Sequence, residues 1–288
     1  MIWLVGNRGQ LGKDIERLLI ERKKPFISSD ADVDIADGTA VERFCAGREI
    51  EWIVNCAAYT AVDRAETEQD KAFSINALGA GNLAEAAKKL GAGLVHISTD
   101  YVFDGTKGGA YTEEDSPCPV GVYGKSKLEG ETLIRERIDA HYIIRTSWLY
   151  GQNGKNFVLT MLRLFNERDE VDVVVDQYGS PTWTVDLAGA ILYLVDHGRG
   201  KYGTYHYSGE GKTTWHGFAK RIYARARELG VIRKDVVINP IKTSQYRTDA
   251  KRPENSYLSK QKIMKTFSIE IPNWGDSLDK FFREMIDR

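Results

Sequence analysis

The sequence predicts an α/β fold, in which a doubly wound parallel sheet carries a smaller α/β lobe. Short β-branched or aliphatic runs alternate with longer segments of helical period, which is typical of parallel strands joined by helices. A glycine-rich turn directly follows the first apolar run. The 288 residues are enough for one large core or two modest ones. We therefore expect one sheet domain with a second, smaller domain attached to it.

The individual elements follow from short apolar runs and from the helical spacing of apolar side chains. The short β-branched runs predict strands at Ile2–Val5, Phe26–Ser28, Trp52–Asn55, Leu94–Ser98, Tyr142–Arg145 and Val173–Val175. Apolar residues at three- and four-residue spacing predict helices at Leu11–Arg22, Val41–Cys45, Lys71–Leu90 and Lys125–Ile138. The glycines at 91 and 93 predict the end of the third of these helices.

The pattern becomes less regular after residue 145. Two helices, Val185–His197 and Thr214–Leu229, are predicted among short strands and scattered prolines. We expect residues 1–145 to form the sheet domain and residues 146–288 to form mainly the smaller lobe. Some segments after residue 170 should return to the sheet.

Charge and composition exclude several classes of protein. The chain has 40 Lys and Arg residues against 41 Asp and Glu, so no bulk field attracts nucleic acid or an anionic membrane. The N-terminal apolar run is too short for a signal peptide, and no later run is long enough to span a bilayer. Three widely separated cysteines indicate no disulfide framework. We expect a cytoplasmic protein.

The glycine-rich turn has the position of a cofactor loop, between the first predicted strand and the first predicted helix. Such a turn lets a pyrophosphate approach backbone N–H groups at a helix N-terminus. Without these flanking elements, a merely flexible turn would be an equally good interpretation. Gly-x-x-Gly-x-x-Gly spacing favours short-chain reductases, and it predicts a Rossmann-type, dinucleotide-binding domain over residues 1–145. The residues of the turn are Gly6, Arg8, Gly9, Gln10, Leu11 and Gly12.

An acidic residue follows the second predicted strand. Asp30 has about the spacing expected for a carboxylate that binds the adenosine ribose. The Asp30-x-Asp32-x-Asp34 pattern also resembles the start of a calcium loop, but Ile35 replaces the required glycine and Val41 the closing glutamate. The five histidines have no metal-ligand spacing. We expect no metal site.

A tyrosine and a lysine predict the chemistry of the site. Tyr123 and Lys127 are four residues apart at the start of a predicted helix, so their side chains emerge on one face. A nearby ammonium would lower the pKa of the phenol and stabilise the phenolate that forms when Tyr123 gives its proton to a carbonyl oxygen. Thr99 follows the fourth strand and could bond the same oxygen, although a turn residue is the commoner role for such a threonine.

These residues and several longer motifs resemble one family, the dTDP-4-dehydrorhamnose reductases of the extended short-chain dehydrogenase/reductases. The resemblance covers nearly the whole chain, and most of its motifs are more specific than the glycine loop. It rests on Gly6–Gly12, Asn55–Asp63, Ser98–Phe103, Val122–Lys127, Arg145–Trp148, Asp176–Thr182 and Arg252–Ser256.

The resemblance implies roles for residues at the matching positions. It implies Thr99, Tyr123 and Lys127 as the catalytic set, with Lys127 also gripping the nicotinamide ribose. The implied contacts with adenine are Asp34 and Ile35, and the implied cofactor wall is Ala57, Ala58 and Tyr59. The implied substrate contacts are Thr60, Val62, Asp100, Tyr101 and Trp148; an arginine clamp for the nucleotide diphosphate at Arg252 is also sensible chemistry.

The implied reaction is reduction of the C4 ketone of dTDP-4-dehydro-L-rhamnose to dTDP-L-rhamnose, with NADPH or NADH, for surface polysaccharide synthesis. Two alternatives stay open. The chain could be a reductase or epimerase of another nucleotide-activated 4-ketosugar, although Tyr101 after Asp100 argues against a dehydratase. It could also be a non-catalytic NAD(P)-binding regulatory subunit, similar to that of methionine adenosyltransferase.

The resemblance also bears on assembly, because some family members are described as magnesium-bridged dimers. Their bridging acid is expected after the Pro-Thr of the Pro181–Asp186 segment, where this chain has Val185. We therefore expect no such metal bridge, and a monomer or weak homodimer.

Overall fold

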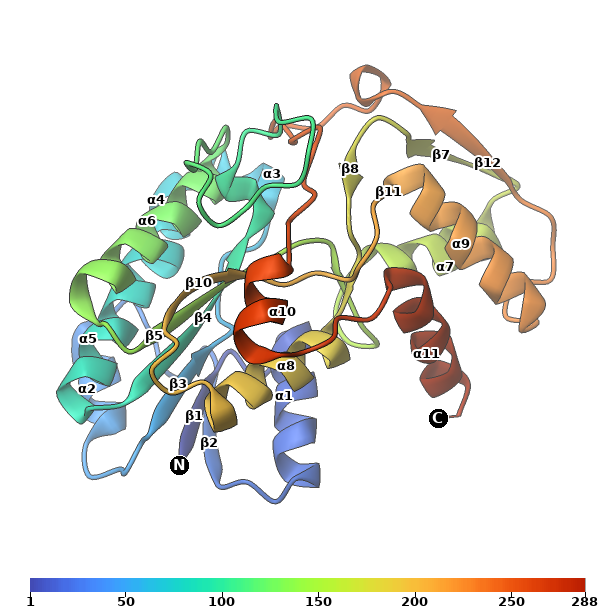
Figure 1. Ribbon diagram of the computed structural model, residues 1–288. Helices are drawn as coiled ribbons and strands as arrows, with labels where there is room; N and C mark the ends of the chain where they lie inside the picture. The colour runs from blue at the N-terminus through green and yellow to red at the C-terminus, as the bar shows by residue number, and fades with distance from the viewer. Residues whose placement is uncertain (288) are drawn as a thin grey trace.

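The computed structural model describes residues 1–287, and its centre is a parallel sheet of six strands (Figure 1). The strand order is β10-β5-β4-β3-β1-β2. All five neighbouring pairs are parallel. The strands are β1 (Ile2–Val5), β2 (Phe26–Ser29), β3 (Trp52–Asn55), β4 (Gly93–Thr99), β5 (His141–Thr146) and β10 (Gly203–His206). The order changes direction between β1 and β3, and open sheets of this kind bind ligands at the carboxyl ends of the strands beside such a point.

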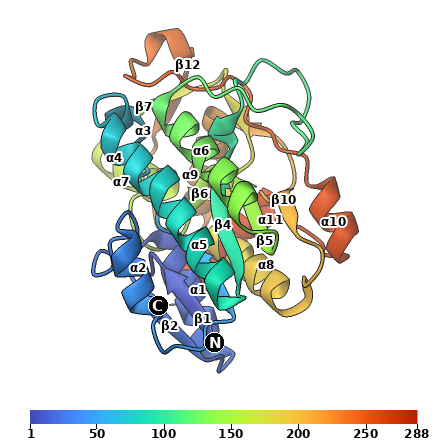
Figure 2. The same cartoon turned by 90° about the vertical axis from the view of Figure 1, so that its left-hand side faces the viewer.

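Helices cover both faces of the sheet, as the alternation of elements predicted (Figure 2). One face packs on α1 (Gln10–Glu21), α8 (Thr184–His197) and α10 (Gln261–Phe267). The other packs on α2 (Gly38–Cys45), α5 (Ala80–Leu90) and α6 (Val122–Arg137). Because β1, β3, β4 and β5 carry apolar side chains on both sides, each face has its own buried core.

The helix predicted over Lys71–Leu90 is interrupted. It consists of α4 (Gln69–Phe73), a π-helical segment (Ser74–Gly79) and α5, which ends at Gly91 in the left-handed conformation. Asn76 lies in the π-helical segment and is buried. Its side-chain amide accepts from Tyr59 N at 2.8 Å and donates to Ser126 Oγ at 2.9 Å. The interruption therefore connects α6 to the loop after β3.

The smaller lobe has a separate core rich in aromatic side chains. Figure 1 shows its helices beside the sheet domain, with β7 and β12 across their upper end. Its helices are α7 (Phe157–Glu167), α9 (Trp215–Glu228) and α11 (Trp274–Ile286). Its strands pair two by two: β7 (Glu170–Val174) with β12 (Val237–Ile241), β6 (Leu149–Tyr150) with β9 (Thr182–Trp183), and β8 (Tyr178–Gly179) with β11 (Thr213–Thr214). Short helical turns lie at Val62–Ala65, Asp100–Val102 and Thr243–Gln245.

The segment predicted as a strand at Val173–Val175 does form a strand, but this strand lies outside the central sheet. The segment overlaps the end of β7 (Glu170–Val174), which pairs with β12 outside the central sheet. Its apolar residues Val171 and Val173 contribute to the core of the smaller lobe. The place beside β5 belongs instead to β10, which begins at Gly203. No helix within residues 1–287 is both long enough and apolar enough to cross a membrane.

Candidate active site

A cavity of about 580 Å³ lies at the carboxyl ends of the central strands. Both domains line it: the glycine loop, the end of β4 and the start of α6 contribute, and so do the segment after β5 and the start of α9. The lining residues include 9–12, 97–101, Tyr123, Lys127, 146–149 and Trp215. The glycine loop and the Tyr-Lys pair are the two motifs that most strongly predict chemistry. In the sequence, 111 positions separate Gly12 from Tyr123. The fold brings both to this cavity.

The glycine loop has the shape that a pyrophosphate requires. Gly9 precedes α1 and provides no side-chain cap, so the first N–H groups of the helix stay available. At Gly12 a Cβ would lie 2.2 Å from the carbonyl oxygen of Gly6, so a larger residue would force the turn open. These residues fit a dinucleotide whose phosphates bind at the helix N-terminus.

Asp30 stands beside this loop, as its position after β2 predicted. Its Oδ2 accepts from the Arg8 N–H at 3.1 Å, and its Oδ1 accepts from Ala31 N at 2.9 Å. The Arg8 side chain is exposed. Ile35 lies in the core against Gly79, and its neighbour Asp34 is exposed.

Tyr123 is the second residue of α6, and two contacts fix the start of that helix. The Glu66 carboxylate accepts from Val122 N at 2.9 Å and so caps the helix. Gly124 lets α6 approach the turn after β4, because a Cβ there would lie 2.2 Å from the Tyr101 carbonyl oxygen. This close approach places Tyr123 beside the carboxyl end of β4.

The Tyr123 hydroxyl lies beside Thr99, the last residue of β4. Burial raises the pKa of Tyr123 well above its ordinary value; Thr99 lowers it in part, and the charges of Asp100 and Tyr101 raise it further. The sequence predicted a pKa lowered by Lys127, and this prediction is wrong for this arrangement. The phenol therefore stays protonated at neutral pH, which is the form that a proton donor needs.

Lys127 is buried one turn further along α6. Its Nζ donates to the Ile97 carbonyl at 2.6 Å and lies 3.1 Å from His96 Nε2, so the amine is directed to β4 and not to the phenol. Burial lowers the pKa of Lys127 to about 8, against the charges of Glu131 and Cys56, which raise it.

His96 is a site residue that the sequence reasoning missed. The Ala57 N–H donates to Asn55 Oδ1 at 3.0 Å, which leaves the Asn55 amide nitrogen to donate to His96 Nδ1 at 3.0 Å. A neutral His96 then carries its proton on Nε2, facing Lys127, which favours the uncharged amine. The sequence could have indicated this role, because His96 and Ser98 are two residues apart on β4 and therefore share the face that meets α6.

A buried carboxylate lies next to Thr99. Asp100 Oδ1 accepts from the Thr99 hydroxyl at 2.9 Å. Burial raises the pKa of Asp100 to about 6, and the hydrogen bonds from Ser256 and Thr99 only partly oppose this. The ionised form of Asp100 is therefore costly to keep in the folded protein.

We expect Asp100→Asn to raise the free energy of unfolding at pH 8 by up to about 3 kcal/mol, from a shift of roughly two pKa units. Because the pKa of Asp100 is raised in the folded protein, its charge lowers the free energy of unfolding by the full amount above pH 6. This destabilisation decreases as the pH falls towards the ordinary pKa of 3.8. Urea unfolding at pH 8 and pH 5 measures the difference. An equal effect at both pH values would contradict the explanation.

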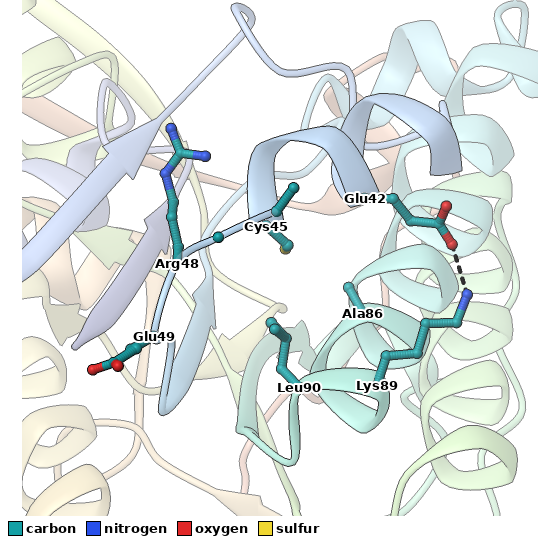
Figure 3. Close-up of a pocket in the computed structure, with 9 residues that line it drawn as sticks. Glu42, Cys45, Arg48, Glu49, Ala86, Lys89 and Leu90 are labelled. Atoms are coloured by element: carbon teal, nitrogen blue, oxygen red, sulfur yellow. Dashed lines mark hydrogen bonds and ion pairs between the residues drawn. The ribbon is translucent and has the colours of Figure 1, made fainter.

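A second hollow, of about 510 Å³, lies between α2 and α5 (Figure 3). Its edge carries a surface ion pair, with Lys89 Nζ 2.6 Å from Glu42 Oε1. The thiol of Cys45 lies there too, and burial raises its pKa, which makes it a poor nucleophile. The chemistry belongs to the first cavity.

Comparison with known proteins matches the chain to one family over nearly its whole length. The family model described as the RmlD substrate binding domain matches residues 1–286. The dTDP-4-dehydrorhamnose reductase of Aggregatibacter actinomycetemcomitans is 40% identical over 281 residues, which cover 96% of each protein. The chain belongs to the dTDP-4-dehydrorhamnose reductase family.

Solved structures of the dTDP-4-dehydrorhamnose reductase family have the same fold. The crystal structure of such a reductase from Clostridium acetobutylicum has a TM-score of 0.93 and 40% identity, over 99% of both chains. One from Bacillus anthracis, in complex with NADP, has a TM-score of 0.93 and 39% identity, over 98% of both chains. The family and the Rossmann-type fold predicted from the sequence are confirmed.

The sequence and the family resemblance predicted further contacts, and the structure divides them into two groups. The cavity lining includes Gly9, Gln10, Leu11, Gly12, Ala58, Thr60, Val62, Asp100, Tyr101 and Trp148. Outside that lining lie Gly6, Arg8, Asp30, Asp34, Ile35, Ala57, Tyr59 and Arg252. Within residues 1–287, no group of three or more His, Cys, Asp or Glu side chains is arranged to hold a metal ion.

Arg252 is tied to the sheet domain at the edge of the cavity. Its Nη2 donates to Asp63 Oδ2 at 2.7 Å, and its Nη1 donates to the Tyr101 hydroxyl at 3.1 Å. Asp63 Oδ1 also accepts from Ala250 N at 3.1 Å. Asp63 belongs to a motif that the sequence analysis noted for the dTDP-4-dehydrorhamnose reductase family, but its partner 189 residues later could not be predicted.

Proposed function

We propose that this protein reduces the C4 ketone of dTDP-4-dehydro-L-rhamnose to dTDP-L-rhamnose, with NADPH or NADH as the reductant, for surface polysaccharide synthesis. The observation that carries the proposal is the meeting of Thr99, Tyr123 and Lys127 with the glycine loop in one cavity. The Bacillus anthracis relative was solved with NADP, which supports a nicotinamide cofactor here.

The residues of the cavity have distinct tasks in this reaction. The nicotinamide cofactor supplies a hydride, and the glycine loop and Lys127 would hold it. Tyr123 gives its hydroxyl proton to the C4 oxygen. The Thr99 hydroxyl, which donates to Asp100 Oδ1 in the free protein, would rotate to hydrogen-bond the same oxygen. Lys127, whose amine is directed to His96 and the Ile97 carbonyl, is proposed to hold the nicotinamide ribose of the bound cofactor.

The direct test is consumption of NADPH or NADH with dTDP-4-dehydro-L-rhamnose, with the configuration of the product determined by NMR. Reduction to dTDP-L-rhamnose is the expected result. Isomerisation of the sugar without loss of reduced cofactor would favour an epimerase. Cofactor binding without any turnover would favour a regulatory subunit.

We propose use of both cofactors, with kcat/KM values that differ by less than roughly 100-fold, or about 2.7 kcal/mol. A carboxylate beside the ribose favours the hydroxyl of NADH, whereas an arginine in the loop favours the phosphate of NADPH. Asp30 is partly exposed and Arg8 exposed, so screening weakens both effects.

Single substitutions should separate these two effects. Asp30→Ala should shift the ratio of kcat/KM values towards NADPH, and Arg8→Ala should shift it towards NADH. Asp30→Asn is the matched control for charge, because its amide oxygen can still accept from the Arg8 N–H. The explanation fails if neither substitution moves the ratio in its stated direction.

We also propose that the protein acts in the cytoplasm as a monomer or weak homodimer, without a magnesium bridge. The three cysteines are all free, which fits a reducing compartment. The position where a bridging acid was expected holds Val185, whose side chain packs against the core of the smaller lobe.

A further inference from the structure

Trp148 has a backbone conformation that large side chains rarely adopt. Its φ is +50°, in the left-handed region. Two other non-glycine residues within 1–287 share this feature, Lys23 and Ser268, and both lie at helix ends, where it is common. Trp148 stands instead between β5 and β6, in the lining of the cavity. Such strain persists where surrounding contacts enforce it, and it is concentrated at functional sites.

Contacts from the smaller lobe enforce this conformation. The indole of Trp148 stacks on that of Trp215, with ring centroids 3.6 Å apart and planes inclined by 10°. It also lies against Gly179, where a Cβ would be 2.6 Å from Trp148 Cε2. The Trp148 carbonyl accepts from Thr182 N at 3.2 Å. The side chain therefore occupies a slot between α9 and the β8 strand.

Trp215 is itself well fixed. It is the first residue of α9, and the Thr214 hydroxyl caps that helix by accepting from Gly217 N at 3.0 Å. Its ring packs on Phe157 at the start of α7, with centroids 4.6 Å apart. Two helices of the smaller lobe thus hold Trp215 rigidly against Trp148.

We propose that Trp215 is a positioning residue, which holds Trp148 so that the stacked pair forms an apolar wall for the sugar ring of a nucleotide-activated ketosugar. This inference rests on the proposed function. Both rings line the cavity that also contains Thr99 and Tyr123. Aromatic faces suit the apolar C–H surface of a sugar ring, and a fixed ring loses little entropy when the ligand binds. Without Trp215, Trp148 loses the stacking contact that covers one face of its ring, and its strained conformation is held less firmly.

The test compares Trp215→Leu, which removes the stack, with Trp215→Phe, which keeps an aromatic face. We expect Trp215→Leu to raise the KM for dTDP-4-dehydro-L-rhamnose by about 10-fold, the upper range for an aromatic pair. The KM for NADPH should stay unchanged, and kcat should fall by less than roughly 3-fold. Trp215→Phe should restore most of the sugar affinity. Should Trp215→Leu fail to fold, Gly179→Ala disturbs the same slot from β8 and should give the same pattern.

A binding measurement separates this inference from the proposed function. Calorimetry with dTDP-L-rhamnose and with dTDP alone should show weaker binding of the sugar nucleotide to Trp215→Leu and unchanged binding of dTDP. Equal losses for both ligands, a raised KM for NADPH, or a wild-type KM for the sugar would overturn the role of Trp215. Absence of turnover by the wild-type protein would instead refute the proposed reaction, and the two binding constants would still decide the role of Trp215.

Discussion

Tyr123→Phe should lower kcat by about 100-fold or more, because it removes the proton donor and leaves the shape of the cavity nearly unchanged. A loss of this size corresponds to about 2.7 kcal/mol of transition-state stabilisation. The phenol is protonated across the working pH range, since burial raises its pKa, so no other ionisation of this residue complicates the result. Steady-state rates with NADPH and dTDP-4-dehydro-L-rhamnose measure it.

Tyr101→Phe is the matched control. The ring of Tyr101 meets that of Tyr123 edge to face at 5.5 Å, and the Tyr101 hydroxyl accepts from Arg252 Nη1. Because Tyr101 is an implied substrate contact, we expect a loss of less than roughly 10-fold that is mainly in KM, as for removal of one hydrogen bond to a charged group. Near-wild-type turnover by a folded Tyr123→Phe variant would refute the assignment of the proton donor.

Glu131→Leu should destabilise the protein by about 3–5 kcal/mol, because it leaves a buried arginine without its partner. Glu131 is fully buried on α6, and its Oε2 lies 2.7 Å from Nη2 of Arg145, whose side chain is 3% exposed on β5. Ser98 on β4 donates to Glu131 Oε1 at 2.6 Å. This network fixes the helix of Tyr123 and Lys127 to the two strands beneath it. Chemical denaturation at pH 7 measures the loss.

Two variants test the cause of that loss. Arg135 also contacts Glu131, at 3.0 Å, but its side chain is 38% exposed. Arg135→Ala should therefore cost about 1 kcal/mol or less. The double variant Glu131→Leu/Arg145→Met should regain much of the stability, because no buried charge remains unpaired. A double variant less stable than Glu131→Leu would contradict the explanation.

The ion pair of Glu131 and Arg145 also predicts how the stability of the protein changes at low pH. Burial raises the pKa of Glu131, but hydrogen bonds and charge from Arg145 outweigh burial, so the pKa is lowered overall. The stability that Glu131 contributes is therefore complete above its ordinary pKa of 4.5 and is lost as the pH falls through the lower, folded-state value. Glu131→Leu should remove this part of the acid sensitivity.

The sequence by itself determined the features that depend on local pattern. Short β-branched or aliphatic runs predicted five strands of the central sheet, and β1 and β3 have the predicted bounds. The position of the glycine loop, after a strand and before a helix, was enough to propose it as a cofactor loop. The four-residue spacing of Tyr123 and Lys127 placed both on one face of α6. These features lie within short segments, where backbone geometry alone decides which side chains share a face.

Only the tertiary structure decided which distant residues meet. The sequence could not show that β10 takes the sheet position beside β5 while β7 joins the other lobe, because an apolar strand fits either core. Lys127 and Tyr123 were expected to interact directly, but His96 and the Ile97 carbonyl direct the amine to β4. The stack of Trp148 on Trp215 depends on two separate segments of chain. Such contacts result from packing of whole elements, and side-chain periodicity along one segment contains no information about its partner.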